Sequence, residues 1–380
     1  MDNRNNNYRS KRNISSRSTS HGEIDRYNYV DRNIYSSSGH GSGPKRRKPK
    51  KHRTAKRVAI VLSCIVLVVI AAVGIYAGVM LGRIDRSDLV DPNSYVEQPS
   101  EAPAWEPISD ENVTNIMLFG MDKGDDGKSH RSDTAILVSI DNKNKQLKMV
   151  SFLRDMYLEI PTVGKNKLNN AFSYGSQGDK GVAGGAALTM QTIENHFRVE
   201  IDKYVAIDFE GFESLIDRLG GIDIDMSQKA AEYENSIMGS NLKEGVNHLD
   251  GRLALYYARL REIDGDFQRT GRQRQVLQAI VTKLKGLNPV EMSSVAYDYL
   301  PLVKTNLSNS DLIYLLGIAG PVSNYEMKTM QVPANGTFTE NYRVQGIGST
   351  IRVDDIEENA RLLREFLYPT TSDSASSEGN

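Results

Sequence analysis

The chain has 380 residues, of which 25% are charged and 39% hydrophobic, with one cysteine and a formal net charge of −1. A single cysteine excludes an internal disulfide framework and multi-cysteine zinc or iron–sulfur sites, and the apolar content excludes a wholly disordered chain. The charge is uneven, because residues 1–57 contain 16 Lys and Arg against 4 Asp and Glu, and the next 24 contain none. The remaining 299 residues carry 31 cations and 44 anions, so the net charge conceals a basic and an acidic part.

The uncharged stretch Val58–Leu81 predicts a transmembrane helix. As a helix, 24 residues extend about 36 Å, which is enough to cross a hydrocarbon core of about 30 Å. A cleaved signal peptide is the alternative, but its apolar region is shorter and a 57-residue leader is too long. Nine Lys and Arg residues lie at positions 45–57, so the positive-inside rule places the N-terminus in the cytoplasm and residues 82–380 outside the cell membrane. This basic cluster is also typical of a nuclear signal or a nucleic-acid patch, but beside a membrane span anionic lipid is the simpler partner. A cluster that only determines the topology, without any partner, is favoured over both.

Composition divides the chain further. Residues 1–57 are rich in Asn, Ser, Arg and Gly, which predicts a disordered cytoplasmic head. Residues 82–110 contain four prolines among acidic residues, which indicates an extended linker. A folded domain is predicted over 111–368, followed by a disordered tail over 369–380.

Hydrophobic patterning predicts the elements of the folded domain in order. Strands are expected at Asn115–Phe119, Thr134–Ile140, Leu147–Phe152, Tyr157–Ile160, Tyr204–Asp208 and Gly221–Asp225. Helices are expected at Ala183–Phe197, Phe209–Leu219, Arg252–Ala258, Asp266–Leu284, Pro289–Val303, Ser310–Ile318 and Asp354–Leu367. This order predicts an α/β fold, an α-β-α sandwich in which helices flank one mixed central sheet that begins with a β-hairpin. The glycine-rich stretch 181–185 lacks the Lys-Ser/Thr of a phosphate-binding loop and is expected to be a flexible turn.

Cations crowd the segment 259–274. Arg259 and Arg261 would point the same way from an extended stretch, and Arg269, Arg272 and Gln273 share one face at the start of a helix. Cations at a helix N-terminus oppose the helix dipole at a cost of about 0.3–1 kcal/mol each unless an anion is bound there. Guanidinium groups and free N–H groups both bind phosphate oxygens. The segment therefore predicts a phosphate site, with salt bridges to Glu262, Asp264 and Asp266 as the alternative.

A second charged cluster follows the predicted strands. Asp122 ends the first strand, Arg131 and Asp133 open the second, and Arg154 and Asp155 follow the third. Ligands often bind at strand ends in α/β sheets, and two acids beside arginines suit a Mg²⁺ ion bridging phosphates. A calcium loop is the weaker alternative, because Gly124 occupies a ligand position and no helix precedes it.

These motifs together resemble the LytR-CpsA-Psr family of cell-wall glycopolymer ligases. The resemblance spans roughly 112–285, with a compatible C-terminal part to about 368. It rests on NIMLFGMD, RSDTAILVSID, MVSFLRDMYLEIP, KLNNAFSYG, FEGFESLIDRLGGIDIDM and YYARLR…GDFQRTGRQRQVLQAI, in this order after an N-terminal anchor. The sequence KLNNA departs from the family's usual Lys-Ile-Asn-His-Ala or Lys-Ile-Asn-Ala-Ala, which leaves the role of that loop open.

The resemblance implies a role for each matching residue. Asp122 and Asp133 match the acids associated with Mg²⁺, and with Arg154 they form the expected catalytic set. The pyrophosphate-binding set is expected to contain Arg131, Arg154, Asp155, Lys167, Arg259, Arg261, Arg269 and Gln273. Whether Asp122 is the base, a metal ligand or both stays open. An apolar groove for the lipid is expected between sheet and helices, with Phe172, Val276 and Ile280 as candidates and ordinary core residues as the alternative.

The resemblance also implies the activity. The enzyme would be a Mg²⁺-dependent phosphotransferase of a Gram-positive bacterium. Its donor would be wall teichoic acid, capsule or a similar polymer carried on undecaprenyl pyrophosphate. Its acceptor would be a muramic-acid hydroxyl of peptidoglycan, and the bond formed would be a phosphodiester. One alternative is a hydrolase of the same lipid pyrophosphate. Another is a polyprenyl-phosphate-binding envelope sensor or transcriptional attenuator without catalysis. Nucleic acid is not an expected partner, because the basic head lacks a folded DNA-binding motif.

Overall fold

The computed structural model describes residues 68, 78–79, 81–83, 108–123, 130–201 and 203–369. The chain divides into two compact units, 1–63 and 64–380, and all of these residues belong to the second. The predicted head, nearly all of the predicted tail, and most of the predicted span and linker lie outside the described residues. Val68, Gly78, Val79 and Leu81 of the predicted span are helical. Within the described ranges, no helix is both long and apolar enough to cross a bilayer.

A six-stranded mixed sheet forms the centre of the second unit. Its strands are β1 (Val113–Lys123), β2 (His130–Asp141), β3 (Gln146–Phe152), β6 (Lys203–Asp208), β9 (Val303–Thr305) and β10 (Glu326–Val332), in the order β10-β3-β2-β1-β6-β9. Strands β1, β2 and β3 pair antiparallel as consecutive hairpins. Strands β6 and β10 join as parallel partners of β1 and β3, and β9 pairs antiparallel with β6. The predicted mixed central sheet and its early hairpin are confirmed.

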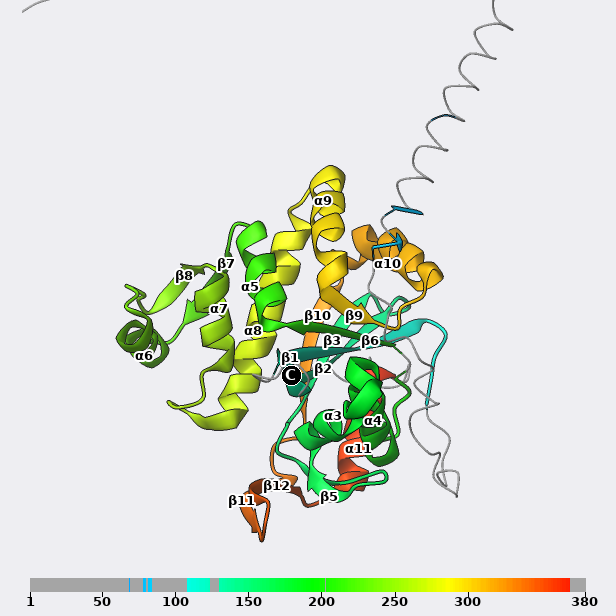
Figure 1. Ribbon diagram of the computed structural model, residues 1–380, viewed down its shortest axis with the longest axis vertical. Coiled ribbons are helices and arrows are strands. Elements are labelled where there is room, and N and C mark those ends of the chain that lie inside the picture. The colour runs from blue at the N-terminus through cyan, green and yellow to red at the C-terminus, as the bar shows by residue number, and fades with distance from the viewer. Residues whose placement is uncertain are drawn as a thin grey trace, which may run out of the picture. The chain divides into compact units, whose positions relative to one another are not determined.

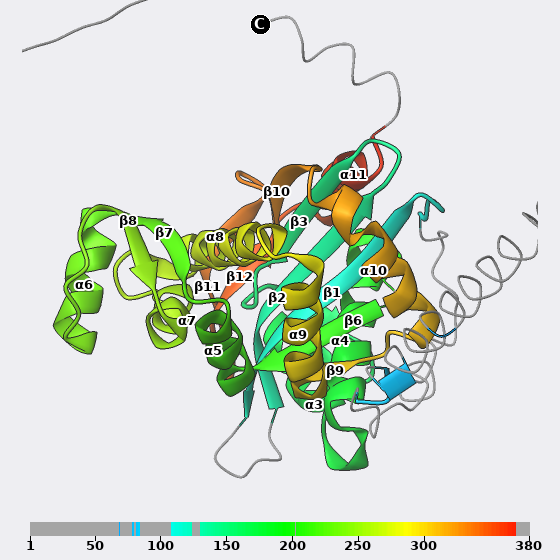
Figure 2. The same ribbon diagram turned by 90° about the horizontal axis from the view of Figure 1, so that it is seen from above.

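Helices cover both faces of the sheet (Figures 1 and 2). One face carries α3 (Leu168–Gly175), α4 (Gly181–Phe197) and α11 (Ile356–Leu367), and the other carries α5 (Phe209–Arg218), α8 (Gly265–Lys285), α9 (Pro289–Tyr299) and α10 (Asn309–Val322). The main apolar cluster lies under α3, α4 and α11 and contains Phe119, Phe152, Phe172 and Tyr204, all at most 2% exposed. This arrangement is the predicted three-layer α/β fold.

A side lobe lies beyond α5 and α8 (Figure 1) and consists of β7 (Ile222–Met226), α6 (Gln228–Met238), β8 (Gly245–Leu249) and α7 (Gly251–Arg259). It has an apolar cluster of its own, to which Ile222, Leu249, Val276 and Ile280 contribute. A Cβ atom on Gly251 would lie 2.1 Å from the carbonyl oxygen of Glu213. Glycine at this position is therefore what lets the start of α7 approach the backbone of α5.

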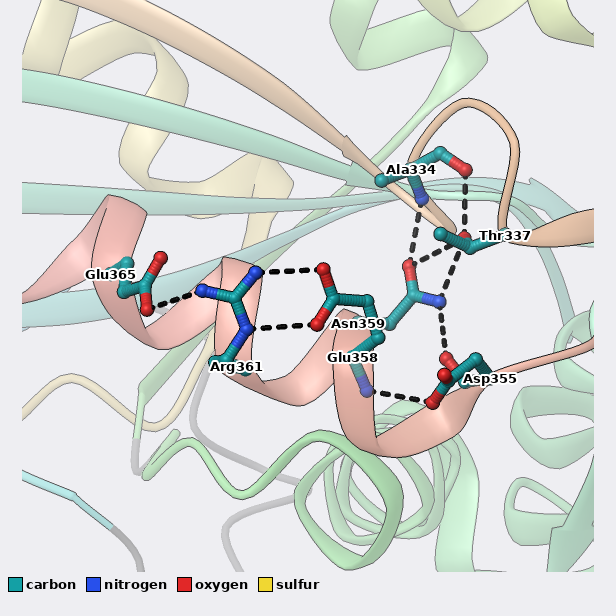
Figure 3. Close-up of polar contacts among 7 residues, drawn as sticks. All are labelled: Ala334, Thr337, Asp355, Glu358, Asn359, Arg361 and Glu365. Atoms are coloured by element: carbon teal, nitrogen blue, oxygen red, sulfur yellow. Dashed lines mark hydrogen bonds and ion pairs between the residues drawn. The ribbon is translucent and has the colours of Figure 1, made fainter.

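Two small ribbons complete the described part of the chain, namely β4 (Tyr157–Ile160) with β5 (Gly164–Lys167), and β11 (Phe338–Val344) with β12 (Gly348–Val353). The turn before β11 is fixed to α11 by Asn359, which is fully buried (Figure 3). The Asn359 side chain accepts the backbone N–H of Ala334 at 2.8 Å and donates to Thr337 Oγ1 at 2.8 Å and to the carbonyl of Asp355 at 2.6 Å. On the outer side of α11, Arg361 forms ion pairs with Glu358 and Glu365.

Every predicted strand and helix of the domain overlaps an observed one, although the bounds of several differ. The helix predicted over Pro289–Val303 ends at Tyr299 and is followed by a 3₁₀ turn at Leu300–Leu302 and by β9, as proline at position 301 disfavours further helix. The prediction of a flexible turn at 181–185 was wrong, because these residues form the first turns of α4. A Cβ on Gly184 would lie 2.3 Å from the carbonyl oxygen of Gly175, so its glycine serves close packing between α3 and α4.

Candidate active site

A β-bulge at the end of the β1–β2 hairpin sets the position of Asp133. Gly120 is opposite Thr134 and Met121 is opposite Ser132, so Asp133 has no partner residue in β1. The Ser132 hydroxyl lies 2.7 Å from the carbonyl oxygen of Thr134 and 3.2 Å from that of Gly120. A bulge redirects the side chain of its extra residue, and here Asp133 Oδ1 lies 2.7 Å from Arg154 Nη1.

Arg154 lies in the loop after β3, whose backbone is fixed on several sides. The N–H of Leu153 donates to the carbonyl of Val332 at 2.9 Å, and the N–H of Asn169 donates to the carbonyl of Arg154 at 3.0 Å. Asp155 Oδ2 is 3.5 Å from Arg154 Nε, and its Oδ1 is 2.9 Å from Lys167 Nζ. Asp133, Arg154, Asp155 and Lys167 thus form one chain of alternating charges that holds the Arg154 side chain, which is 13% exposed.

The charge state of Asp133 follows from its neighbours. Burial acts to raise the pKa of this carboxyl, but the ion pair with Arg154 and the positive charges of Arg269 and Arg259 outweigh it and leave the pKa below its usual value. Asp133 is therefore a carboxylate at neutral pH. Its two further arginines come from distant parts of the sequence, so the tertiary fold gathers cations around this acid.

Helix α7 ends at the pocket with Arg259, the last residue of the helix. The N-cap carboxylate of Asp250 accepts the N–H of Leu253 at 2.9 Å and so fixes the start of this helix. The Arg259 guanidinium lies over the ring of Phe209, with its Cζ 4.4 Å from the ring centroid. Such stacking holds a cation in place while leaving its N–H groups available to an anion.

The arginines of α8 have different roles. Arg269 is 3% exposed and Gln273 is 9% exposed, and both line the pocket. Arg272, which shares their helix face in the sequence pattern, makes two bonds to Asp264, at 2.8 and 2.9 Å, and a further bond to the carbonyl of Leu260. Arg269 and Gln273 therefore face the cavity, whereas Arg272 follows the salt-bridge alternative and joins the loop 260–264 to α8.

These residues border a cavity of about 510 Å³. Five arginines contribute to its lining, together with three acids, one glutamine and several apolar or uncharged residues. They are Arg154, Arg252, Arg259, Arg261 and Arg269; Asp133, Glu213 and Glu262; Gln273; and Thr134, Phe209, Met238, Leu255, Tyr256 and Leu260. Cations outnumber acids, so the cavity is suited to a multiply charged anion.

The predicted site residues divide into two groups. One group lines a single cavity and contains Asp133, Arg154, Arg259, Arg261, Arg269 and Gln273. Asp122, Arg131, Asp155 and Lys167 are not among its lining residues. Asp155 is ion-paired to Arg154 and Lys167 to Asp155, and Asp122 is opposite Arg131 at the end of the hairpin where the chain passes from β1 to β2.

Sequence reasoning missed part of the lining that comes from α5 and α7. Helical periodicity places two further lining residues on the same face of α7 as the predicted Arg259, namely Arg252 and Tyr256 at spacings i, i+4 and i+7. That spacing could have identified Arg252 and Tyr256. Glu213 carried no such signal, because it reaches the cavity only through the packing of α5 against α7.

A second, apolar cavity borders Arg154 on the α3–α4 side of the sheet. It measures only about 10 Å³ and is lined by Arg154 together with Phe119, Ser132, Ala135, Leu168, Asn169, Phe172 and Thr189. The rings of Phe119 and Phe172 lie 5.1 Å apart, centroid to centroid. Val276 and Ile280 follow the alternative of ordinary core residues, because they belong to the separate apolar cluster of the side lobe, whereas Phe172 borders this cavity.

Potential metal ligands are dispersed among the described residues. No three His, Cys, Asp or Glu side chains among them gather closely enough to form a metal site from protein ligands alone. The calcium-loop alternative cannot be followed, since positions 124–129 lie outside the described part of the chain.

Comparison with known proteins gives a consistent result. The sequence model of the LytR_cpsA_psr family matches residues 84–361. The polyisoprenyl-teichoic acid–peptidoglycan teichoic acid transferase TagU of Enterococcus faecalis is 33% identical over 266 residues, which cover 68% of this chain and 81% of that protein. The regulatory protein MsrR of Staphylococcus aureus is 30% identical over 266 residues, covering 69% of this chain and 76% of that protein. The solved structure of the protein YwtF (TagT) with bound octaprenyl pyrophosphate lipid shares 25% identity at a TM-score of 0.52, covering 75% of this chain and 98% of that one.

Proposed function

The chain belongs to the LytR-CpsA-Psr family, and from this premise we propose that it is an extracytoplasmic phosphotransferase anchored by the span 58–81. Its donor is a glycopolymer, such as wall teichoic acid or capsule, carried on undecaprenyl pyrophosphate. Its acceptor is a hydroxyl of peptidoglycan, and the bond formed is a phosphodiester. The transferase name of TagU supports the type of reaction, and the lipid bound to TagT supports the type of donor.

The position of Arg154 is the observation that carries this proposal. This residue borders the arginine-lined cavity on one side and the apolar cavity of Phe119 and Phe172 on the other. A polyprenyl pyrophosphate has the same division, with a charged head joined to an apolar chain. The apolar cavity holds about one small group as it stands, so the chain would enter only as the two phenyl rings separate.

Phosphoryl transfer in this pocket depends on position and charge. The acceptor hydroxyl oxygen attacks the phosphorus that carries the glycopolymer, the bond from that phosphorus to the bridging oxygen breaks, and undecaprenyl phosphate leaves. Arg154, Arg259 and Arg269 would stabilise the charge that develops on the bridging and non-bridging oxygens. Asp133 is ion-paired to Arg154 and its pKa is lowered, which makes it a poor base. The proposal therefore assigns the hydroxyl proton to Asp122, the other carboxylate of the expected catalytic set.

A Mg²⁺ ion is part of the proposal, and the donor set is compatible with it. Mg²⁺ is usually held by one or two carboxylates, with substrate phosphate and water completing its ligands. Asp133 is ionised and gives one oxygen to Arg154, so its second oxygen is chemically able to bind a cation, with Asp122 as the other carboxylate. Bound there, the ion would supply positive charge beside the pyrophosphate.

The test uses the full chain in liposomes, with Mg²⁺, a synthetic polyprenyl-pyrophosphate-linked glycan and a peptidoglycan oligomer, and detects the product by mass spectrometry. We expect a phosphodiester-linked product from the wild type and a loss of about 10²–10³ in rate for Arg154→Ala, the typical cost of removing one charge-stabilising donor. Arg361→Ala is the matched control, because Arg361 is also ion-paired to two residues but lies on the outer side of α11. Addition of EDTA tests the metal separately.

Each other outcome has a clear meaning. Release of free glycan phosphate without attachment would identify a lipid pyrophosphate hydrolase. Tight binding of the lipid with neither product would favour the sensor, for which the name of MsrR is the supporting comparison. Full activity of Arg154→Ala would refute the assigned role of the pocket.

A further inference from the structure

Helix α10 is apolar on all sides, which is unusual for a helix at a protein surface. After Asp311 it contains no charged residue up to its end at Val322. Its inner side packs Leu315, Ile318 and Val322 into a cluster with Ile140 and Leu147. Its outer side is equally apolar and has no protein layer above it among the described residues, so packing within the domain does not account for it.

The outer side forms a stripe that we call the α10 face. Ile313, Leu316, Gly317 and Gly320 are spaced i, i+3, i+4 and i+7, and all are exposed. Ile313 is 58% exposed and Leu316 is 62% exposed, and the ring of Tyr314 beside them is 42% exposed. Exposed apolar surface of this kind marks a place of contact with another apolar phase or protein.

The end of the predicted membrane span lies beside this face. Arg83 follows Leu81, the last residue of the span, by two positions, and its guanidinium carbon lies 3.9 Å from the ring centroid of Tyr297 in α9. Figures 1 and 2 both show the described residues of this stretch, in blue, next to α10. The point at which the chain would leave a bilayer is therefore held against the same side of the domain.

The charges around the α10 face suit anionic headgroups. The turn after β2 carries the exposed Lys143 and Lys145, and the side chain of Asn142 in this turn donates to the Tyr314 hydroxyl at 2.7 Å. Asp311 in the first turn of α10 and Glu326 at the start of β10 are each paired with a lysine: Asp311 with Lys203 at 3.1 Å, and Glu326 with Lys328 at 3.4 Å. Tyrosines and lysines around an apolar stripe are typical of helices that lie at a membrane interface.

We propose that the α10 face lies on the surface of an anionic lipid bilayer, with Ile313 and Leu316 inserted at the boundary between headgroups and acyl chains. The proposal rests on the membrane anchor of the proposed function. A second copy of the chain fits less well, because three large exposed side chains fall short of the about 800 Å² that each partner buries in a standard interface. Docking adds a second attachment to the anchor, and two attachments fix the domain's orientation where one linker leaves it variable.

The single tryptophan of the chain allows a direct test. In a full-length Trp105→Phe background, Leu316→Trp is compared with Val246→Trp, which is 75% exposed on β8 of the side lobe. Both variants are reconstituted in liposomes containing phosphatidylglycerol and lipids brominated on the acyl chain. We expect brominated lipid to reduce the Leu316→Trp fluorescence roughly by half, since interfacial side chains lie about 5–10 Å deep, and to leave Val246→Trp unchanged. The quenching should weaken when phosphatidylcholine replaces the anionic lipid.

Absence of quenching for Leu316→Trp overturns the proposal, as does equal quenching of both variants. A blue-shifted but unquenched Leu316→Trp emission also overturns it, and indicates a protein partner on the face. Carbonate extraction of the same liposomes reports the anchor independently, so that its failure is distinguished from failure of docking. The readout does not depend on phosphotransfer, and an inactive protein that shows the quenching leaves the proposal standing.

Discussion

Arg272 and Arg259 lie close together in the sequence, but the structure predicts opposite effects when each is replaced. Arg272 is 7% exposed on its side chain and makes two bonds to Asp264 and one to the carbonyl of Leu260. Arg272→Ala removes all three and leaves a buried carbonyl without this donor. Breaking a fully buried ion pair costs about 3–5 kcal/mol, but Asp264 is 32% exposed, so we expect about 3 kcal/mol, as for hydrogen bonds to charged groups.

Among the described residues, Arg259 stacks on one aromatic ring and forms no ion pair comparable to that of Arg272. Its guanidinium stacks on Phe209 while its side chain is exposed, so Arg259→Ala should cost only about 0.5–1 kcal/mol of stability. Its loss should instead act on the proposed reaction, because it removes a cation from the proposed pyrophosphate site. The pair therefore separates a residue that shapes the pocket from one that binds in it.

Thermal unfolding of the full chain, followed by circular dichroism at 222 nm, measures the difference. For a domain of this size we expect the Tm of Arg272→Ala to fall by about 6–12 °C and that of Arg259→Ala by about 1–4 °C. Arg272→Lys should give an intermediate Tm, because one ammonium group cannot reproduce the planar two-bond contact. The reasoning would be refuted by an Arg272→Ala protein that melts with the wild type, or by a larger fall in Tm for Arg259→Ala.

Three further outcomes can be measured on the same protein. Burial raises the pKa of Glu234 to about 7, aided by the charge of Asp250 and opposed by Arg272. The folded state then holds a proton that the unfolded state has lost, so the stability of the protein should decline as pH rises from about 4.5 to 7. Parallel profiles of Tm against pH for the wild type and Glu234→Gln over this range would contradict the assignment. Gly251→Ala should destabilise the protein by about 2 kcal/mol or more and reduce glycopolymer transfer, because the added methyl group would lie 2.1 Å from a carbonyl oxygen of α5. Gly271→Ala is the control within α8, because its added methyl group would lie 4.0 Å from the nearest side-chain atom. It should stabilise the protein by about 0.5–1 kcal/mol in urea unfolding. Lys148→Met should lower the free energy of unfolding by about 3–5 kcal/mol in the same assay, because it leaves Asp141 buried and charged without its partner. A loss below about 1 kcal/mol would show that the bonds of Lys148 to Asp141 and to the carbonyl of Leu367 contribute little to stability.

The position of most elements could be predicted from the sequence, because their periodicity is local. Strands β1, β2 and β3 alternate apolar residues, and α11 repeats them every three to four residues, so each was found near its observed bounds. Helices α3 and α6 were missed, since α3 is only eight residues long and α6 presents few buried residues. The last strands, β10 to β12, were missed as well, and β10 joins the sheet through a parallel pairing with β3 across a separation of 180 residues.

The sequence by itself determined which residues bear charge and which of them share a helix or strand face. Through the family resemblance it placed Arg154 and Arg269 in one pyrophosphate-binding set and Asp133 in the catalytic set, and the structure gathers these three residues around one cavity. Only the tertiary structure decided the partner of each. Helical spacing puts Arg269 and Arg272 on the same face, but the loop that returns before α8 brings Asp264 to one of them alone.

The same limit applies to glycines and to apolar residues. The sequence of α4 shows that Gly184 lacks a side chain, but the need for this arises from α3, which packs against it at 2.3 Å from where a Cβ would be. The apolar pattern of α10 predicts a helix, but only the fold shows that one apolar side is left uncovered, beside the end of the predicted span. Local spacing determines which side chains share one face of a helix or strand. Which other element that face contacts depends on how the whole chain folds.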